Sequence, residues 1–390
     1  MVSAKYICKW LINAICSQLD NSFVMCIISL LHIYILCCGM LVKLNQIIMF
    51  SLFAFFLAWA LYPLYIRFLK YIHAGKQIRE DSVTGEKSSI FSQMHKHKSG
   101  TPTMGGGLFL LVMWIMIAVS YFLQYKGIIN NTLVSRQETY VLLFGFFSLG
   151  FLWLLDDFFN IRGKWAIKWL SAKAKMVWMI VVAWFISRWF YSKLGVDYIN
   201  FRPFAGEVHL GLFYPVITFF ITISIVNAIN ITDGLDGLAG WLMTIILFIL
   251  GIVTFGYQTY IATTVIAILI AILVAFMFFN INPAKIFMWD SWAFALGWFL
   301  ASLLYILNMR MGIMIPFLII FLLFIVDVGS SLLQIIWKKR FHKKLFAVSP
   351  LHHLFEHKGI PEPTIVMKAW MLQGILAAIA IIAVFYQISG

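Results

Sequence analysis

The sequence predicts an all-α membrane protein that crosses the bilayer many times. Of its 390 residues, 63% are hydrophobic and 11% are charged, a composition that excludes a water-soluble globular chain. Its mean hydropathy is +0.94. Its apolar runs are about 20 residues long, which is the length that an α-helix needs to cross the hydrocarbon core. These observations set the fold class before any motif is considered.

Eleven apolar runs are separated by polar or basic loops, and each run is expected to form one transmembrane helix. Ten of these helices are expected to form the main domain, residues 45–390, and the first to lie in an N-terminal extension, residues 1–44. Residues 195–210 alternate enough to predict a short β-hairpin outside the membrane. The runs cover residues 22–42, 46–69, 103–123, 138–156, 175–191, 211–230, 238–256, 260–279, 293–309, 312–336 and 368–388.

The N-terminal extension differs in composition from the rest of the chain. All five cysteines lie within it, without metal-ligand spacing. Such a change indicates an appended segment, either a genuine extra helix or translation from a start upstream of the true one. Because Lys5 and Lys9 precede the first apolar run, the segment could insert as a signal anchor. No catalytic role is expected for it.

Basic residues set the expected orientation, since Lys and Arg concentrate in cytoplasmic loops. The loops at 70–102, 156–175, 280–292 and 337–368 together hold 19 Lys and Arg, whereas the opposite side holds 6. The first set is therefore assigned to the cytoplasm. The net charge of +14 is explained by this topology together with affinity for anionic lipid or a phosphorylated substrate. Nucleic acid binding is not needed to explain it.

Three acidic clusters lie where apolar runs meet the cytoplasmic loops: Asp156 with Asp157, Asp233 with Asp236, and Asp290. A carboxylate inside a bilayer costs about 3 kcal/mol on insertion scales, so acids kept near one usually face a cavity, a cation or a substrate. The threading of the apolar runs brings all three clusters to one side of the membrane. A functional site is therefore expected there.

The second cluster carries the strongest chemical signal. Asp233 and Asp236 are three residues apart and would share a face if the segment were helical, beside Asn227 and Asn230. The alternative is a helix cap with solvated polar neighbours, but a cap needs only one such side chain. We therefore interpret these four residues as part of a binding site.

Two basic loops carry weaker signals. Lys76 and Lys98 precede Thr101 and a glycine-rich turn at 105–107, an arrangement that can hold phosphate through lysine charge and backbone N–H groups. A solvated loop entering a glycine-tolerant helix is the alternative. In the loop at 337–368, His352 and His353 either belong to the site or contact solvent or lipid headgroups.

Several motifs in one order make the chain recognisable. They are the segments 100–106, 156–157, 227–239 and 350–353, with a further motif at Asn280, Pro283, Phe287, Met288 and Asp290. From about residue 45 onward the chain resembles the phospho-N-acetylmuramoyl-pentapeptide transferase family of bacterial peptidoglycan synthesis.

The resemblance implies a ten-helix enzyme of the bacterial plasma membrane with its active site on the cytoplasmic face. It implies transfer of phospho-MurNAc-pentapeptide from UDP-MurNAc-pentapeptide to undecaprenyl phosphate, with release of UMP and a requirement for Mg²⁺. Joining two anionic phosphates needs a cation to neutralise their oxygens, and carboxylates are natural Mg²⁺ ligands. The oligomeric state stays open, with a homodimer among the expectations.

The resemblance also implies roles for individual residues. Asp290 is expected to bind the metal, and Asp156 with Asp157 to assist attack by the lipid phosphate and to share the metal; the division of roles among these three stays open. His352 and His353 are expected to contact the phosphates or govern their protonation. The positions expected to bind substrate are Lys76, Lys98, Thr101, Asn227, Asn230, Asp233, Asp236, Asn280 and Gln334.

The chain also departs from the family pattern. Leu354 replaces a third consecutive histidine, Asp327 stands where glutamate is common, and Asn160 replaces a usual lysine. Tryptophan stands where the family has glycine at 169, 241, 289, 292 and 298, and an indole adds bulk that a packed site cannot absorb. Trp289 and Trp292 are therefore expected to obstruct the metal and the nucleotide.

Two explanations of these tryptophans stand beside each other. An aromatic belt would place indoles where helices leave the bilayer. The other is that the source reads UGA as glycine and that this chain was translated with UGA as tryptophan. The second explains why the tryptophans coincide with glycine positions, so we favour it.

Two rival functions would account for part of this pattern. A related transferase that uses UDP-GlcNAc would keep the aspartates and Mg²⁺, but the motifs at 101–106 and 350–353 favour the muramoyl enzyme. An ion-coupled transporter would also carry intramembrane acids, although it predicts them near mid-membrane. The acids of this chain instead flank loops.

Overall fold

The computed structural model of this protein describes residues 21–75, 98, 100–161, 172–202, 204–288 and 290–389. The chain divides into two compact units, Met1–Met49 and Phe50–Gly390. All elements after α2 belong to the second unit. The elements are α2 (Asn21–Tyr71), α4 (Gly107–Tyr125), α5 (Gln137–Ile161), α6 (Ala172–Leu194), β1 (Tyr198–Asn200), β2 (Glu207–His209), η2 (Gly211–Phe213), α7 (Tyr214–Thr232), α8 (Leu238–Gly256), α9 (Tyr260–Asn280), α10 (Asp290–Met311), α11 (Met314–Ile320), α12 (Leu322–Phe341), α13 (Leu351–His357) and α14 (Glu362–Ser389).

The apolar runs form helices, which confirms the all-α polytopic class. Within the described residues, eight helices are long and apolar enough to cross a membrane, and α11 with α12 make a ninth candidate. The runs at 22–42 and 46–69 form one helix, α2. The sequence between them holds no proline or glycine that would end a helix. The run at 175–191 forms α6, whose ends carry basic residues and which is not among the eight.

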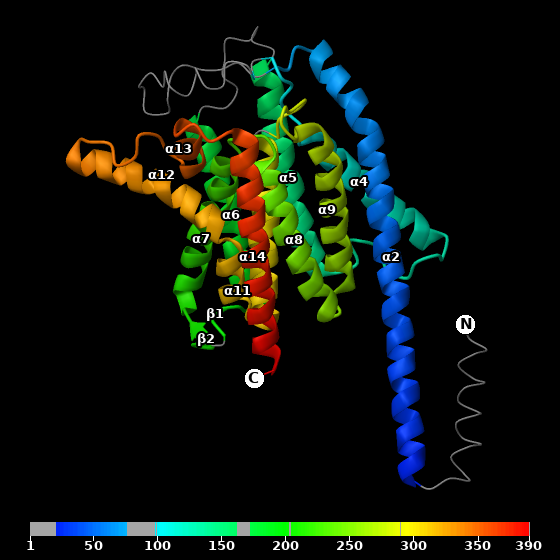
Figure 1. Cartoon of the computed structure of the whole chain (residues 1–390). Helices are drawn as coiled ribbons and strands as arrows, with labels where there is room; N and C mark the ends of the chain where they lie inside the picture. Colours follow the sequence, from blue (N-terminus) through cyan, green and yellow to red (C-terminus); the bar gives the residue numbers. More distant parts are fainter. Residues whose placement is uncertain are drawn as a thin grey trace. The chain divides into compact units, whose positions relative to one another are not determined.

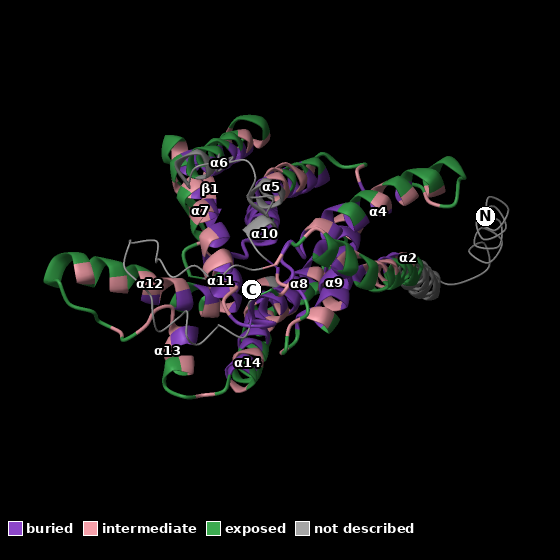
Figure 2. Ribbon diagram, turned by 90° about the horizontal axis from the view of Figure 1, so that it is seen from above, coloured by how far each residue is buried: buried purple, intermediate pink, exposed green. Residues whose placement is uncertain are grey.

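The most buried span of the second unit is α10. It packs against α5 and α7, while α8 packs against α9 and α14, and these helices enclose the core (Figure 2). Of the most apolar stretch of α10, 94% is buried. A helix buried on all sides presents little surface to lipid, so α10 is the central support of the bundle.

The predicted span at 312–336 is bent. Helices α11 and α12 meet at an angle of 68°, and α12 leaves the bundle while α11 stays packed against α14 (Figure 1). Most side chains of α12 are exposed or half-buried, with Asp327 and Ser330 among the few buried ones. Helix α12 therefore projects sideways from the bundle (Figure 1).

The hairpin predicted at residues 195–210 is confirmed. Strands β1 and β2 pair antiparallel, with Ile199 opposite Val208, and the hydroxyl of Tyr198 donates to the carbonyl of Met309 at 3.2 Å. The hairpin lies at the opposite end of the bundle from α13 (Figure 1). The α7–α8 turn, the α9–α10 connection and α13 share the other end.

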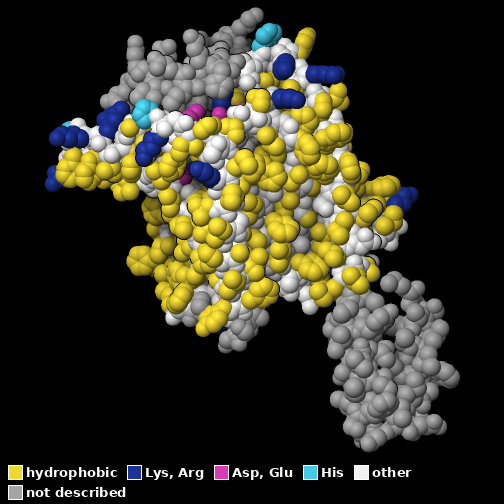
Figure 3. All heavy atoms as spheres, viewed as in Figure 1, with side chains coloured by type: hydrophobic (Ala, Val, Ile, Leu, Met, Phe, Trp, Pro, Cys, Tyr) yellow, Lys and Arg dark blue, Asp and Glu magenta, His cyan; other side chains and the backbone are white. Residues whose placement is uncertain are grey.

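Basic side chains gather at the end that carries α13. Figure 3 shows Lys, Arg and His side chains there and along α12, above a flank that is almost entirely hydrophobic. Three of these basic residues, Lys338, Lys339 and Arg340, form the last turn of α12. This distribution matches the charge asymmetry expected from the sequence.

Candidate active site

The turn between α7 and α8 is the centre of the candidate site. Helix α7 ends at Thr232, and Gly237 adopts a left-handed conformation (φ 80°) that favours glycine. The N–H of Gly237 donates to Oδ1 of Asn280 at 3.0 Å, and Nδ2 of Asn280 donates to the carbonyl of Ile286 at 2.8 Å. Asn280, expected to bind substrate, therefore braces the turn against the α9–α10 connection.

A buried ion cluster holds the second aspartate of the turn. Nζ of Lys98 lies 2.7 Å from Oδ1 of Asp236 and 2.6 Å from Oε1 of Glu362. The side chain of Lys98 is only 5% exposed. Burial by itself lowers the pKa of Lys98, but the two carboxylates outweigh it and raise that pKa above its ordinary value. The ammonium is thus committed to two protein carboxylates.

The other carboxylate oxygen of Asp236 is also occupied. Oδ2 accepts from Nδ2 of Asn282 and from the N–H of Ala284, both at 3.1 Å. Asp236 therefore joins the α7–α8 turn to the segment that leads into α10. In this arrangement both of its oxygens bind protein groups.

The glycine-rich turn lies against the same segment. The N–H of Phe287 donates to the carbonyl of Pro102, and the N–H of Gly105 donates to the carbonyl of Phe287, each at 2.9 Å. A Cβ atom on Gly105 would lie 2.8 Å from the carbonyl oxygen of Phe287, so only glycine permits this approach. Thr101 is half-buried at the start of this turn. Lys76 lies outside the described residues.

The two histidines face the α7–α8 turn. Nδ1 of His352 lies 2.8 Å from Oδ2 of Asp327, and Nδ1 of His353 lies 3.1 Å from Oε2 of Glu356. A Cβ atom on Gly234 would collide with Nε2 of His352 and lie 3.0 Å from Nε2 of His353. Both outer ring nitrogens therefore point at the backbone beside Asp233.

The environments of the histidines differ. Within the described part of the chain, Nε2 of His352 is buried and has no hydrogen-bond partner. Burial lowers the pKa of His353, although the carboxylate of Glu356 opposes the shift. Both rings are buried, so they are not solvated side chains of an exposed loop.

The first and third acidic clusters approach each other through helix register. Helices α5 and α10 run antiparallel: Glu138 pairs with Arg310 at one end, and Gly150 faces Ala295 further along. Continued along both helices, this register places Asp290, the first residue of α10, beside the end of α5, where Asp156 is fully buried. The side chains of Asp157 and Asp290 lie outside the described residues.

The remaining predicted residues have mixed positions. Asn227 donates to the carbonyl of Ile223 within α7, and Asn230 and Asp233 are half-buried near the end of that helix. Oε1 of Gln334 accepts the N–H groups of Leu345 and Phe346. Gln334 therefore fixes the loop after α12 and takes no other role in the described structure.

Sequence reasoning missed Glu362 and Asn282. Glu362 opens the last apolar helix of the structure, so it is another acid at a membrane boundary, like the aspartates. The sequence places the start of the last apolar run at residue 368, six residues after Glu362, so the hydropathy pattern does not mark this acid as a boundary residue. No local pattern distinguishes Asn282, whose role depends on contacts with distant segments.

Two of the questioned tryptophans lie in the core. Trp292 and Trp298 are each 1% exposed, so an aromatic belt does not account for them. The ring centroids of Trp292 and Phe109 are 3.4 Å apart. The indole of Trp298 fills the space beside Gly145 where a Cβ atom would lie. Trp292 packs behind Gly106 and does not protrude from the core, while Trp169 and Trp289 lie outside the described residues.

A groove beside His352 leads away from the site. It has a volume of about 420 Å³, and its polar lining includes Thr232, Asp327 and His352. The rest is mostly apolar and comes from α8, α12, α13 and α14, including Leu242, Leu323, Val326, Phe355, Ile365 and Leu372. One end of the groove can therefore hold a polar group while the walls hold a hydrocarbon chain.

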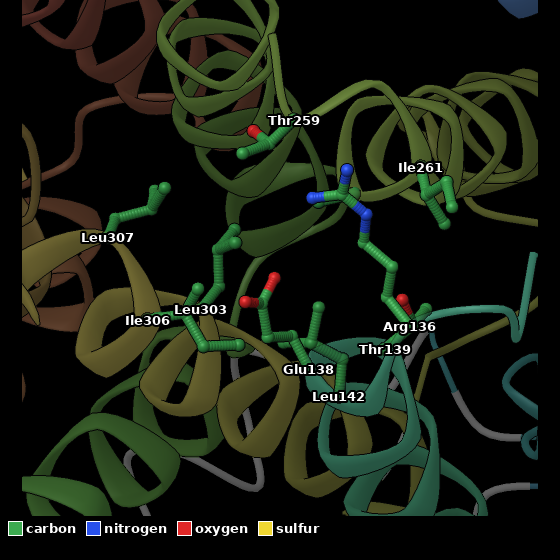
Figure 4. A pocket seen from close by; sticks show the side chains of 10 residues that line it. Arg136, Glu138, Thr139, Leu142, Thr259, Ile261, Leu303, Ile306 and Leu307 are labelled. Atoms are coloured by element: carbon green, nitrogen blue, oxygen red, sulfur yellow. The ribbon is translucent and has the colours of Figure 1, made fainter. Parts of the chain in front are cut away.

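A second pocket lies at the other end of the bundle. Arg136, Glu138 and Thr139 of the α5 start line it together with Leu303 and Leu307 of α10 (Figure 4). Its volume is about 10 Å³ and none of the predicted site residues lines it. It is too small for a substrate.

Comparison with known proteins supports the sequence resemblance. Residues 139–308 match the glycosyl transferase family 4. Phospho-N-acetylmuramoyl-pentapeptide-transferase of Thermoanaerobacter sp. (strain X514) is 31% identical over 350 residues, which cover 89% of this chain and 100% of that protein. The protein of the same name from Bacillus pumilus (strain SAFR-032) is 32% identical over 87% of this chain and 98% of its own length. That from Clostridioides difficile (strain 630) is 31% identical over 89% and 100%.

Proposed function

We infer that this chain, which belongs to the phospho-N-acetylmuramoyl-pentapeptide transferase family, transfers phospho-MurNAc-pentapeptide from UDP-MurNAc-pentapeptide to undecaprenyl phosphate. An oxygen of the lipid phosphate forms a bond to the phosphorus that carries the sugar. The bond from that phosphorus to the UMP oxygen breaks, and UMP leaves. The products are UMP and a lipid-linked sugar diphosphate.

The groove beside His352 is the observation that carries the acceptor assignment. Its apolar walls suit a polyprenyl chain, and Lys368 and His352, which also line it, suit the phosphate of that chain. Helix α12, which is bent by 68° from α11, forms one wall of the groove, and the lipid is proposed to enter from that side. We assign the groove to undecaprenyl phosphate.

His352 is proposed to contact a phosphate oxygen through Nε2. Asp327 lies 2.8 Å from Nδ1 and fixes the ring orientation, which leaves Nε2 directed at Gly234. Nε2 accepts a proton when the ring is neutral and donates one when it is charged. The neutral ring can therefore accept a proton from the acceptor phosphate, and the charged ring can donate one to a phosphate oxygen.

The aspartates at the α5 and α10 ends suit Mg²⁺. Asp156, Asp157 and Asp290 supply only carboxylate oxygens, which are the ligands that Mg²⁺ prefers. Among the side chains that the structure describes, no three of the His, Cys, Asp and Glu residues form a metal-binding group. Because two of these three aspartates lie outside that set, their proposed role rests on the helix register. When bound, Mg²⁺ would neutralise phosphate oxygens during transfer.

The nucleotide half of the donor is proposed to bind over the α7–α8 turn. Asn227 and Asn230 lie in the last turns of α7 and Asp233 follows them, while the glycine-rich turn at 105–107 packs against the α9–α10 connection. The other residues assigned to substrate binding are Lys76, Thr101, Asp236, Asn280 and Gln334. The last three are proposed to act through their hydrogen bonds to neighbouring protein groups. The excess of basic residues at this end supports a location at the cytoplasmic face of the bacterial plasma membrane.

The test is turnover by the purified chain. UMP release would be measured with UDP-MurNAc-pentapeptide and undecaprenyl phosphate, with and without Mg²⁺, and with UDP-GlcNAc as a competing donor. We expect Mg²⁺-dependent release with the muramoyl donor only, and loss of release in Asp290→Asn. Release with UDP-GlcNAc would move the chain to the related transferase, and release independent of metal would overturn the metal assignment.

A further inference from the structure

Glu362 joins three separate segments of the site. Its Oε1 accepts from Nζ of Lys98 and from the N–H of Asp236, each at 2.6 Å. Its Oε2 lies 3.4 Å from Nδ2 of Asn282. These donors belong to the loop before α4, the α7–α8 turn and the α9–α10 connection. One carboxylate at the start of α14 thus holds three segments, each of which carries or adjoins predicted site residues.

Burying the three charges of this cluster costs free energy. Two carboxylates share one ammonium, and the side chains of Lys98, Asp236 and Glu362 are 5%, 3% and 8% exposed. Burying such a cluster often stabilises a fold no more than apolar residues of similar size would. Its value is therefore geometric, because its charged hydrogen bonds fix the direction of each partner.

The helix that carries Glu362 can support this geometry. Helix α14 packs against α8 and α11, and the rings of Trp241 and Trp370 lie 5.0 Å apart where α8 meets α14. The N–H of Asp236 is held two residues beyond Gly234, the glycine that Nε2 of His352 and His353 face. A shift of the turn would therefore change the distance between the histidines and Asp233.

We propose that Glu362 is a positioning residue for the transfer reaction. Through Lys98 and the backbone of Asp236 it holds the α7–α8 turn against His352 and His353, with Nε2 of each ring directed at Gly234 beside Asp233. It touches neither substrate. This proposal rests on the proposed function, since it assigns the reacting phosphates to these two histidines.

Two substitutions separate the ion pair of Glu362 with Lys98 from its hydrogen bond to the N–H of Asp236. Glu362→Gln keeps an oxygen for the N–H of Asp236 but removes the charge that faces Lys98. Glu362→Ala removes both. Because a misplacement of about 1 Å can cost about 10²-fold in rate, we expect kcat to fall about tenfold in E362Q and about a hundredfold in E362A, with KM for the donor changed less. Glu207→Gln, in the exposed strand β2, is the matched control and should change neither.

A second readout does not depend on turnover. His352 and His353 are buried, so diethyl pyrocarbonate should modify them slowly in the wild type. If the turn is held by Glu362, modification measured by mass spectrometry should be severalfold faster in E362A and unchanged in Glu207→Gln. A wild type without turnover would refute the proposed function, yet the modification rates would still test the position of the turn.

The outcomes are distinct. Lower kcat with faster histidine modification, in variants whose elution and melting temperature match the wild type, supports the proposal. Unchanged kcat and unchanged modification overturn it, as does a loss of activity that only follows the fraction of unfolded protein. If E362A does not fold, E362Q decides, because it keeps the side-chain volume.

Discussion

Nδ1 of His352 lies 2.8 Å from Oδ2 of Asp327, and the same oxygen accepts from Oγ1 of Thr232 at 3.0 Å. The backbone N–H of His352 also donates to Oδ1 of Asp327 at 3.3 Å. One carboxylate therefore fixes the ring, the start of α13 and the end of α7. A histidine held at Nδ1 presents a defined Nε2 to its substrate.

This contact predicts the effect of changing Asp327. Asp327→Asn offers an amide to Nδ1, which favours the wrong tautomer, so UMP release should fall by roughly 10²-fold. Asp327→Glu is the control, since a carboxylate remains and the family resemblance places glutamate here. The comparison of kcat between the two variants checks the role. Equal losses in both would show that packing, and not the carboxylate, matters.

The lowered pKa of His353 predicts a pH dependence of stability. Because the folded pKa lies below the ordinary value of 6.5, the unfolded chain binds more protons between these two values. The contribution of neutral His353 to the free energy of unfolding is present above pH 6.5 and is lost as the pH falls toward the pKa of the folded state. The melting temperature in detergent should therefore rise from about pH 5.5 to about pH 7.5.

The matched variants isolate that contribution. His353→Gln should flatten the pH dependence more than His357→Gln, the matched control at an exposed histidine of the same helix. An identical pH profile in wild type and His353→Gln would contradict the assignment. Melting curves of the three proteins at a series of pH values are sufficient.

The groove beside His352 predicts a selective effect on the acceptor. Leu372 on α14 lines it, whereas Ile379 lies on the same helix outside it, and the two are equally exposed at 46%. Leu372→Trp narrows the groove and should raise the KM for undecaprenyl phosphate by about tenfold, the loss expected from about 1.4 kcal/mol of binding free energy. The KM for the donor should stay the same. Ile379→Trp should change neither value, and an equal effect of both would place the acceptor elsewhere.

Much of the fold was predictable from local sequence patterns. The lengths of the apolar runs predicted helices, and the alternation at 195–210 predicted the hairpin, because both signals depend on neighbouring residues. The bend between α11 and α12 was not predicted. The sequence around Phe321 has no proline or glycine, so nothing local marks that break.

The site was predicted less completely than the fold. Charges at membrane boundaries identified Asp156, Asp233 and Asp290 as members of one end. The partners of Lys98 were not predictable, because Glu362 is 264 residues away and no local rule pairs them. Asp236 and Asn280 were expected to bind substrate, and their described contacts are with protein groups, since a site this close to a membrane must also satisfy its own backbone.

The tryptophans at 241, 292 and 298 place polar indole N–H groups in the protein interior. Within the described residues, Nε1 of Trp241, Trp292 and Trp298 is buried without a hydrogen-bond partner. A buried donor left without a partner costs about 1–3 kcal/mol. Replacing a well-packed core tryptophan by a small residue usually costs about 3–5 kcal/mol. Removing the unpaired indole donor would stabilise the protein, whereas removing a packed side chain would destabilise it. The stability of the glycine variants therefore distinguishes the two cases.

If the native residues are glycines encoded by UGA, Trp292→Gly and Trp298→Gly should raise the melting temperature and kcat, singly and together. Removal of the indoles would then leave room for the helix backbones to approach each other at Gly106 and Gly145, as close helix packing requires. Trp184→Gly is the control: it is 47% exposed, and glycine in an exposed helix position should lower stability by about 1 kcal/mol. Destabilisation of both core variants by several kcal/mol, or UGG codons at 169, 241, 289, 292 and 298, would show that the tryptophans are native.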